Sequence, residues 1–307
     1  MKRTVLMVIS ILAALCVLLL VPLPEHHGDR WMVYLQDFAH FVLFALAVFL
    51  LVFLPGGTCA LSLRRAVLIV AAALGIGLLA EFVQPFVGRT AGARDVLLGV
   101  TGGVAAVCVC AALSKRAWIM RVSCGSIALA LAFAAVLPLV LIRCDRQAAR
   151  RAFPLLASFE SRAEIGRWSV NGCRVSRTRE RATHGNWTLK IEVEKPDNYP
   201  GIFLTDSVLD LSHMRRLCFD AHVPGPTPLK IWLRIDDRMD PVYTERFQDF
   251  RTLFPGTNTL CVERAIAEST PSGRSLDLGR IHSLGLFFDQ AKPGDILYID
   301  NVRVLSK

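Results

Sequence analysis

The sequence predicts a protein of two parts, an α-helical membrane bundle followed by an all-β jelly roll or sandwich. Two observations lead to this fold class. Of the 307 residues 53% are hydrophobic, and residues 1–151 hold long apolar stretches. From Phe153 onward the apolar residues come in short alternating runs separated by Pro and Gly, which is typical of strands joined by turns. We therefore expect a helical domain at residues 1–145, a linker at 146–155 and an exported β-domain at 156–307.

Five apolar segments are each close to the ~17–25 residues that cross a bilayer as a helix. They are Val5–Leu23, Phe38–Leu54, Ala66–Phe82, Val96–Leu113 and Ser126–Ile142. The first follows two basic residues, as a signal peptide does, but its end at residues 21–24 (VPLP) offers no small-residue cleavage site. We therefore expect five transmembrane helices, the first of them retained.

The formal charge of +9 is unevenly distributed and orients the helices. Residues 1–151 carry 14 Lys and Arg against 6 Asp and Glu, whereas residues 152–307 carry 21 against 20. A nucleic-acid-binding protein would instead show a basic surface on its soluble part, so we exclude that class. Basic residues gather on alternate connections, at Lys2, Arg3, Arg64, Arg65, Lys115, Arg116 and Arg121. The positive-inside rule then places the N-terminus in the cytoplasm and the C-terminal domain outside.

Polar side chains stand at the ends of these apolar segments, where they are costly and mark functional sites by default. In the expected topology, six of them lie at the outer membrane face: Asp37, His40, Glu81, Gln84, Arg89 and Asp95. The i,i+3 spacing places Asp37 and His40 on one face of their helix. It places Glu81 and Gln84 on one face of the next helix in the same way. Alternatively, Asp37 and Asp95 only cap helix ends. A Glu81–Arg89 ion pair would be either structural or catalytic.

The same residues resemble the motif of the VanZ-like membrane family over residues 30–110. The motif reads Asp37-x-x-His40-Phe41-x-x-Phe44, then Glu81-Phe82-x-Gln84-x-x-x-x-Arg89, then Asp95 and a Gly-rich helix. The family usually has Asn four residues after that Asp, where this chain has Gly99. Members are associated with the bacterial cell envelope, so the resemblance implies a multi-pass protein of the bacterial inner membrane. We interpret Gly75, Gly77, Gly99, Gly102 and Gly103 as helix-packing residues, with Gly99 and Gly103 also fitting a dimerisation motif.

The second half carries short strand candidates separated by turn signals. They include Thr188–Val193, Arg216–Ala221, Leu229–Ile235, Leu284–Phe288 and Ile296–Val304. Many such strands over about 150 residues indicate a sandwich or jelly roll. The domain resembles galactose-binding-like, carbohydrate-binding jelly rolls over residues 156–305. This resemblance rests on Phe159-Glu160, on residues 184–189 (HGNWTL), on residues 210–212 (DLS) and on residues 297–302 (LYIDNV).

The resemblance implies sugar binding through aromatic faces beside polar groups. Alternation along residues 229–235 sends Leu233 and Ile235 to the core, and Trp232, Arg234 and Asp236 to the other face. Further along the chain, Tyr243, Arg246 and Phe247 add aromatic and charged side chains of the same kinds. The alternative is that Trp232 belongs to the core.

The resemblance further implies a structural calcium near the terminal strands, for which Glu160 and Asp300 are candidate oxygen ligands. The alternative is that Asp300 only makes backbone hydrogen bonds at the strand edge. Three cysteines, Cys173, Cys218 and Cys261, lie in this half, where one disulfide is possible and one thiol would be left over.

Three functional hypotheses follow. In the first, the bundle recognises a lipid-linked or other envelope ligand and the β-domain binds glycan, without catalysis. In the second, the bundle is an enzyme on a lipid-linked or acylated envelope substrate, with Glu81 or His40 as general base and Arg89 as anion clamp. In the third, the chain is a sensor or scaffold that binds a protein. Membrane lipid is a partner in each. The sequence shows no recognisable catalytic motif, so we favour a non-enzymatic role.

Overall fold

The computed structural model describes residues 10, 29–53, 62–87, 92–114, 117–195, 199–206, 208–239 and 241–306. It divides into two compact units. Unit 1 comprises Met1–His26 and Trp31–Leu141, and unit 2 comprises His27–Arg30 and Ile142–Lys307.

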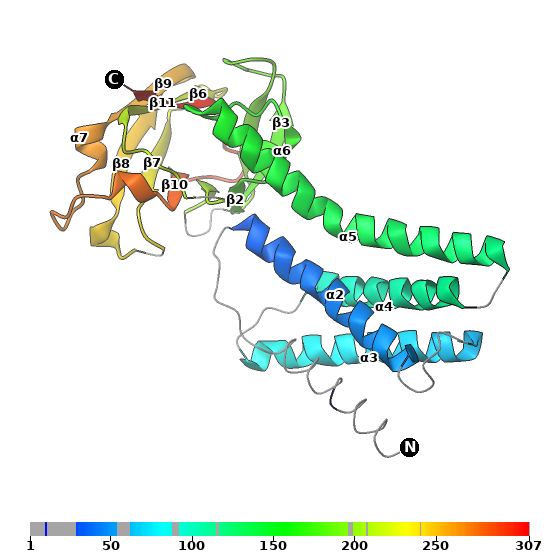
Figure 1. The fold of residues 1–307 in the computed structure, drawn as a ribbon. Helices are drawn as coiled ribbons and strands as arrows, with labels where there is room; N and C mark the ends of the chain where they lie inside the picture. Colours follow the sequence, from blue (N-terminus) through cyan, green and yellow to red (C-terminus); the bar gives the residue numbers. More distant parts are fainter. Residues whose placement is uncertain are drawn as a thin grey trace. The chain divides into compact units, whose positions relative to one another are not determined.

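Four helices in the described part of the chain are long and apolar enough to cross a membrane (Figure 1). They are α2 (Arg30–Phe53), α3 (Leu63–Val83), α4 (Ala93–Leu113) and α5 (Trp118–Ala152), and a short 3-10 helix, η1 (Gln84–Val87), continues α3. They match the second to fifth predicted segments. The first, Val5–Leu23, lies outside the described residues except for Ser10. Large apolar side chains also point away from the helix core, such as Leu79 at 62% and Phe82 at 70% exposure, which is the pattern of helices that face lipid.

Small residues allow α2, α3 and α4 to pack closely. A Cβ on Gly102 would lie 2.2 Å from the carbonyl oxygen of Phe41, so the backbones of α4 and α2 meet at this glycine. A Cβ on Gly99 would lie 3.0 Å from the Phe44 ring. The glycines that face a neighbouring helix are Gly77, Gly99, Gly102 and Gly103, which confirms their predicted role. Gly75 has no described atom within 4 Å, so the prediction is wrong at that position.

Helix α5 extends well beyond the apolar segment predicted for it. Its 35 residues correspond to about 52 Å of helix, against about 30 Å of hydrocarbon core. The residues expected as a linker, 146–155, are helical as far as Ala152, and strand β1 (Leu155–Ala157) begins three residues later. The final turns of α5 therefore belong to unit 2 as ordered structure.

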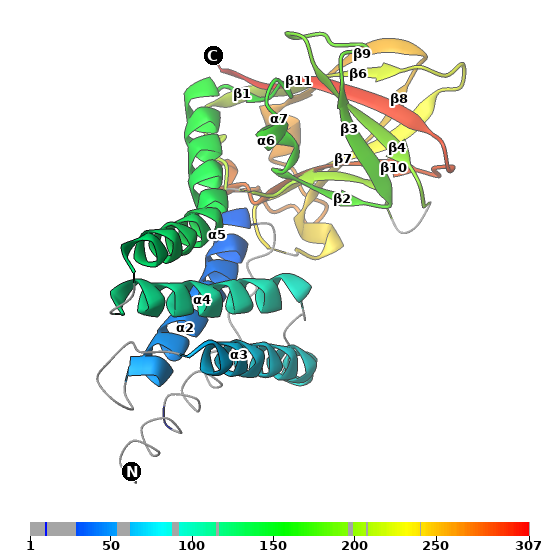
Figure 2. The same ribbon diagram turned by 90° about the vertical axis from the view of Figure 1, so that its right-hand side faces the viewer.

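Unit 2 is a sandwich of two antiparallel sheets, as predicted (Figures 1 and 2). Sheet A has the order β3 (Cys173–Thr178), β4 (Thr188–Val193), β11 (Ile296–Ser306), β6 (Met214–Val223), β9 (Gly256–Glu263), and β1 also pairs with β11. Sheet B has the order β2 (Trp168–Asn171), β5 (Gly201–Leu204), β10 (Ser283–Asp289), β7 (Leu229–Asp236), β8 (Phe247–Leu253). The short helices are α6 (Arg162–Ile165), η2 (Tyr243–Glu245), α7 (Arg264–Ala267) and η3 (Leu278–Arg280). Every strand predicted from the sequence is present.

The sandwich core lies between the two sheets and takes every second residue of the central strands. Ile191 of β4, Ile202 of β5 and Ile231 of β7 are all 0% exposed. Because successive strand residues point to opposite faces, their neighbours stand on the outer surfaces. The core therefore fixes which side chains of sheet B face outward.

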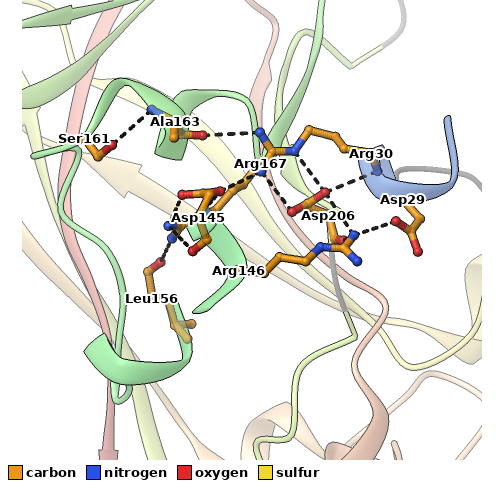
Figure 3. A network of polar contacts seen from close by, with 9 residues as sticks. All are labelled: Asp29, Arg30, Asp145, Arg146, Leu156, Ser161, Ala163, Arg167 and Asp206. Carbon is orange, nitrogen blue, oxygen red and sulfur yellow. Dashed lines mark hydrogen bonds and ion pairs between the residues drawn. The ribbon is translucent and has the colours of Figure 1, made fainter. Parts of the chain in front are cut away.

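A cluster of buried charges lies at one end of unit 2 (Figure 3). The cluster consists of three arginines and three aspartates, namely Asp29, Arg30, Asp145, Arg146, Arg167 and Asp206. Asp145 accepts hydrogen bonds from Arg30 Nη2 at 2.7 Å and from Arg167 Nη2 and Nε at 2.6 and 2.9 Å. Asp206 accepts from Arg30 Nε at 2.9 Å. The side chains of Asp145 and Asp206 are each only 3% exposed, so their charges are compensated by the arginines rather than by water.

Candidate functional site

The structure brings together four of the six polar residues predicted in the helical half, His40, Asp95, Asp37 and Glu81. His40 Nε2 of α2 lies 3.7 Å from Asp95 Oδ2 of α4, and His40 Nδ1 hydrogen bonds to the Gln36 carbonyl oxygen at 3.1 Å. The Asp95 carboxyl also interacts with Asp37 and Glu81. Asp95 is not the N-cap of α4, because that position is Gly92. A buried imidazole beside carboxyl groups is an arrangement able to accept and pass on a proton.

Glu81 and the two other predicted residues of this cluster differ in their placement. Glu81 accepts a hydrogen bond from the backbone N–H of Gly92, and Gln84 is fully buried. Arg89 lies outside the described residues, so the predicted Glu81–Arg89 pair stays a prediction. Sequence reasoning missed Arg94, whose Nη1 lies 3.1 Å from Asp37 Oδ2 and whose guanidinium carbon lies 4.1 Å from the centre of the Tyr34 ring. Its position directly before Asp95 was the available signal.

The second candidate site is the outer face of sheet B. In β7, Ile231, Leu233 and Ile235 are buried in the core, and Trp232 and Arg234 alternate with them. Trp232 is therefore on the face opposite the core, as the alternation predicted. The pairing of the sheet extends this face across neighbouring strands, because Trp232 stands opposite Phe287 of β10 and Phe250 of β8.

Five aromatic side chains cover this part of sheet B, and we call them the aromatic face: Tyr199, Phe203, Trp232, Phe250 and Phe287. The Trp232 ring centre lies 5.2 Å from that of Phe250 and 6.5 Å from that of Phe287. Phe287 also contacts Phe203 at 6.2 Å and Tyr199 at 5.2 Å. Phe250 is 40% and Tyr199 is 63% exposed. Phe287, which contacts three of the other rings, is itself only 2% exposed, so the rings most accessible on this face are Phe250 and Tyr199, with Trp232 and Phe203 half-buried.

Two glycines allow β5 and β10 to approach closely, Gly285 against the Phe203 ring and Gly201 against the backbone of β10 at Leu286 and Phe287. A Cβ on Gly285 of β10 would lie 2.5 Å from the Phe203 ring, and a Cβ on Gly201 of β5 would lie 2.6 Å from Cβ of Phe287. Phe203 thus covers the glycine paired with it on the next strand. This packing holds the Phe203 ring in place.

Polar groups continue the same face beyond the rings. Arg234 Nε lies 2.9 and 2.8 Å from the two carboxylate oxygens of Asp236. Gln248 of β8 pairs with Arg234 across the strands, and its side-chain amide lies 3.0 Å from Arg246 Nε. Burial raises the pKa of the Asp236 carboxyl above its ordinary value, although Arg234 and Arg246 oppose that shift. The predicted residues Trp232, Arg234 and Asp236 therefore share one face, but Phe247 belongs to the core.

The candidate calcium ligands do not fit a metal site. Glu160 Oε1 accepts hydrogen bonds from the backbone N–H groups of Asn186 and Trp187, at 2.8 Å each. Asp300 Oδ2 accepts from the N–H groups of Thr183 and His184 at 2.7 and 2.8 Å.

The backbone carbonyls that lie beside Glu160 are occupied as well. The carbonyl oxygens of Phe159 and Glu160 both accept from the Arg177 guanidinium. Calcium needs six to eight oxygen ligands, whereas hydrogen-bond donors already occupy Glu160 Oε1, both carboxylate oxygens of Asp300 and the two carbonyl oxygens. The described residues also contain no group of three or more His, Cys, Asp or Glu that could hold a metal ion. Asp300 makes the backbone hydrogen bonds foreseen as the alternative, but it also accepts from Thr183 Oγ1 at 3.3 Å and lies on the interior strand β11, so the alternative is met in part.

Two of the three cysteines of this half form a disulfide, and the third is a free thiol. Cys218 of β6 and Cys261 of β9 face each other in the strand register and are bonded. Cys173 is a free thiol, and burial raises its pKa to about 11. A thiol with so high a pKa is a poor nucleophile.

The sequence matches no protein-family model and no curated protein. Three solved structures illustrate what the chain is similar to. An exo-β-agarase matches at 17% identity and a TM-score of 0.42, over 50% of this chain and 25% of its own. A family 11 carbohydrate-binding module from Clostridium thermocellum, in complex with a β-1,3-1,4-mixed-linked tetrasaccharide, matches at 18% and 0.39, over 50% of this chain and 94% of its own. The C-terminal family 22 carbohydrate-binding module of Clostridium thermocellum Xyn10B matches at 13% identity and a TM-score of 0.34, over 50% of this chain and 96% of its own. The chain thus spans about a quarter of the agarase. These values are too low to transfer a ligand or a site.

Proposed function

We propose that this protein is a membrane-anchored glycan-binding protein of the bacterial cell envelope. The single observation that carries the proposal is the aromatic face of sheet B with its polar border. The accessible rings of this face offer stacking surfaces for the C–H faces of sugar rings, and the adjoining side chains offer hydrogen bonds to hydroxyl groups. Exposed aromatic clusters of this kind are rare on a surface without a binding role.

The membrane assignment is supported by the helices. Each is long and apolar enough to span, and much of its apolar surface is exposed within unit 1. The basic residues on alternate connections favour an N-terminus in the cytoplasm and a β-sandwich outside. The disulfide between Cys218 and Cys261 supports the same orientation, because such bonds persist in oxidising compartments.

The test is sugar binding by the full-length protein in detergent micelles, measured by titration calorimetry against a panel of neutral and acidic oligosaccharides. We expect Trp232→Ala and Phe250→Ala each to weaken binding about tenfold or more, since both remove exposed parts of the platform. The matched control is Phe254→Ala, which removes an exposed aromatic ring after β8 and should leave binding unchanged. A fall of several degrees in the melting temperature of Trp232→Ala, without a specific loss of binding, would instead identify Trp232 as a structural residue.

The polar cluster of unit 1 supports a second candidate function, an enzyme acting on a lipid-linked or acylated envelope substrate. The specific observation is the convergence of His40, Asp95 and Asp37, with Glu81 interacting nearby. This is also the part of the chain that resembles the VanZ-like family. We expect His40→Gln and Glu81→Gln to abolish an envelope phenotype while the amount of protein in the membrane stays constant. Reduced abundance of either variant would identify a structural role instead.

A further inference from the structure

Two guanidinium groups stand at one end of the aromatic face, on neighbouring strands. Arg234 lies two residues after Trp232 on β7, about 7 Å along the strand, and Arg246 immediately precedes β8. Because Gln248 pairs with Arg234, Arg246 is a diagonal neighbour of Arg234 across the two strands. An oligosaccharide that stacks on Trp232 and runs along β7 toward Arg234 would therefore bring the substituents of that ring or of the next one to the two guanidinium groups.

The hydrogen bonding of these arginines leaves donors pointing to solvent. Arg234 contacts Asp236 through Nε, and within the described part of the chain its two terminal nitrogens carry no hydrogen bond. Its side chain is 20% exposed. Two terminal nitrogens of one guanidinium match the two oxygens of a carboxylate, sulfate or phosphate.

Arg246 supplies the excess charge. It forms no ion pair with a carboxylate among the described residues, and its contacts are the Gln248 amide, at 3.0 Å from Nε, and the Tyr243 ring, at 5.4 Å. Asp236 balances one of the two arginines, because it is the carboxylate that both of them face. One positive charge is therefore left at this end of the face, held in place by an amide and a ring.

We propose that Arg234 and Arg246 form an anion subsite that selects oligosaccharides bearing an oxyanion group on the ring stacked at or beside Trp232. The inference rests on the proposed glycan-binding function and adds the class of glycan. The ligands that fit this subsite have in common a carboxylate, sulfate or phosphate substituent on a sugar ring. Neutral glycans still stack on the rings but lack the charged hydrogen bonds.

The test compares ligands that differ only in charge, using the full-length protein in detergent micelles. An oligogalacturonide is titrated beside its methyl ester, and a sulfated and a phosphorylated oligosaccharide are each titrated beside the form without that group. We expect at least one acidic ligand to bind about tenfold tighter than its neutral counterpart, because hydrogen bonds to charged groups add that much or more. The difference should shrink as salt is raised. The three acidic ligands show which oxyanion is preferred.

The variant Arg246→Gln should lose the preference, so that each acidic ligand binds no tighter than its neutral counterpart, and Arg246→Lys should keep part of the preference. The matched control is Arg251→Gln, an equal change on β8 whose side chain alternates to the opposite side of that strand and pairs with Asp249. Equal affinity for each charged and neutral pair, unchanged by Arg246→Gln, would overturn the anion subsite while glycan binding stands. Binding of no sugar, acidic or neutral, by the folded protein would overturn the proposed function and the subsite together. If Arg246→Gln does not fold, Arg246→Lys and the ligand pairs decide the question.

Discussion

Replacing Asp145 with Asn tests whether the buried charge cluster of unit 2 stabilises the sandwich. Asp145 accepts three hydrogen bonds of 2.6 to 2.9 Å from two guanidinium groups. The cluster balances three arginines with three aspartates, so the substitution leaves one positive charge without compensation. The change is nearly isosteric, and its effect therefore comes from the charge rather than from lost volume.

The magnitude follows from the burial of the groups involved. The Asp145 side chain is 3% exposed, and those of Arg30 and Arg167 are 20% and 10% exposed. Breaking a buried ion pair by removing one partner costs about 3–5 kcal/mol. The exposure of Arg30 lets water relieve part of that cost, so we expect about 3 kcal/mol of lost unfolding free energy.

Urea unfolding of the full-length protein in detergent micelles measures this loss. Trp168, Trp187 and Trp232 lie in unit 2, whereas Trp31 and Trp118 lie in unit 1; with the latter two replaced by Phe in every protein compared, tryptophan fluorescence reports on the sandwich. With a slope of about 2 kcal/mol per molar urea, the midpoint should fall by about 1.5 M. The matched control is Glu268→Gln, which breaks an exposed pair with Arg264 of 2.7 Å and should cost less than about 1 kcal/mol.

An Asp145→Asn midpoint no lower than that of the Glu268→Gln control would refute the reasoning. The double variant Asp145→Asn with Arg167→Gln gives a second check, because it removes one charge of each sign. Its loss of stability should be smaller than the sum of the two single losses, since the two residues share one network.

Three other predictions concern the sheets. Gly285→Ala places a Cβ 2.5 Å from the Phe203 ring, so calorimetric titration of this variant should show weaker sugar binding. The control Gly225→Ala, which has open space around it, should bind sugar normally. Affinity for a sulfated oligosaccharide, whose own charge persists in acid, should rise as the pH falls toward the pKa of Asp236, which burial raises above its ordinary value, because protonation removes the negative charge facing Arg234 and Arg246. Asp236→Asn should remove this pH dependence, and a dependence that persists would contradict the assignment. Replacing Cys218 and Cys261 together by Ser should cost about 2–5 kcal/mol in thermal unfolding, whereas Cys173→Ser should cost little; equal effects would argue against the pairing.

The strands that the sequence predicted are those whose apolar pattern is strong. β4, β6, β7, β10 and β11 lie inside the sheets; β4 and β7 alternate buried with half-exposed residues, and β6, β10 and β11 hold runs of buried residues. The strands left out include the four sheet edges, β3, β9, β2 and β8. Edge strands such as Cys173–Thr178 are largely polar and half-exposed, because they contact the core on a single side. Their pattern is therefore hard to distinguish from that of a loop.

The candidate sites were predicted to different degrees for a similar reason. Side chains on one strand, such as Trp232 and Arg234, can be assigned to one face by alternation alone. Phe203, Phe250 and Phe287 join them only through the register of three other strands, and that register depends on the whole sheet. Arg94 was missed because an arginine beside a helix start is usually solvated, and only the packed helices show that it faces Asp37.

The pairing of a ring with a glycine on sheet B has a consequence for how the protein can diverge. Phe203 needs the empty position at Gly285, where a Cβ would meet its ring. Gly201 instead faces the backbone of β10, so a side chain gained there would push the two strands apart whatever residue stands at 287. Related sequences should therefore change 203 and 285 together, large with small, and keep glycine at 201, so that these two patterns become an evolutionary signature of a retained platform.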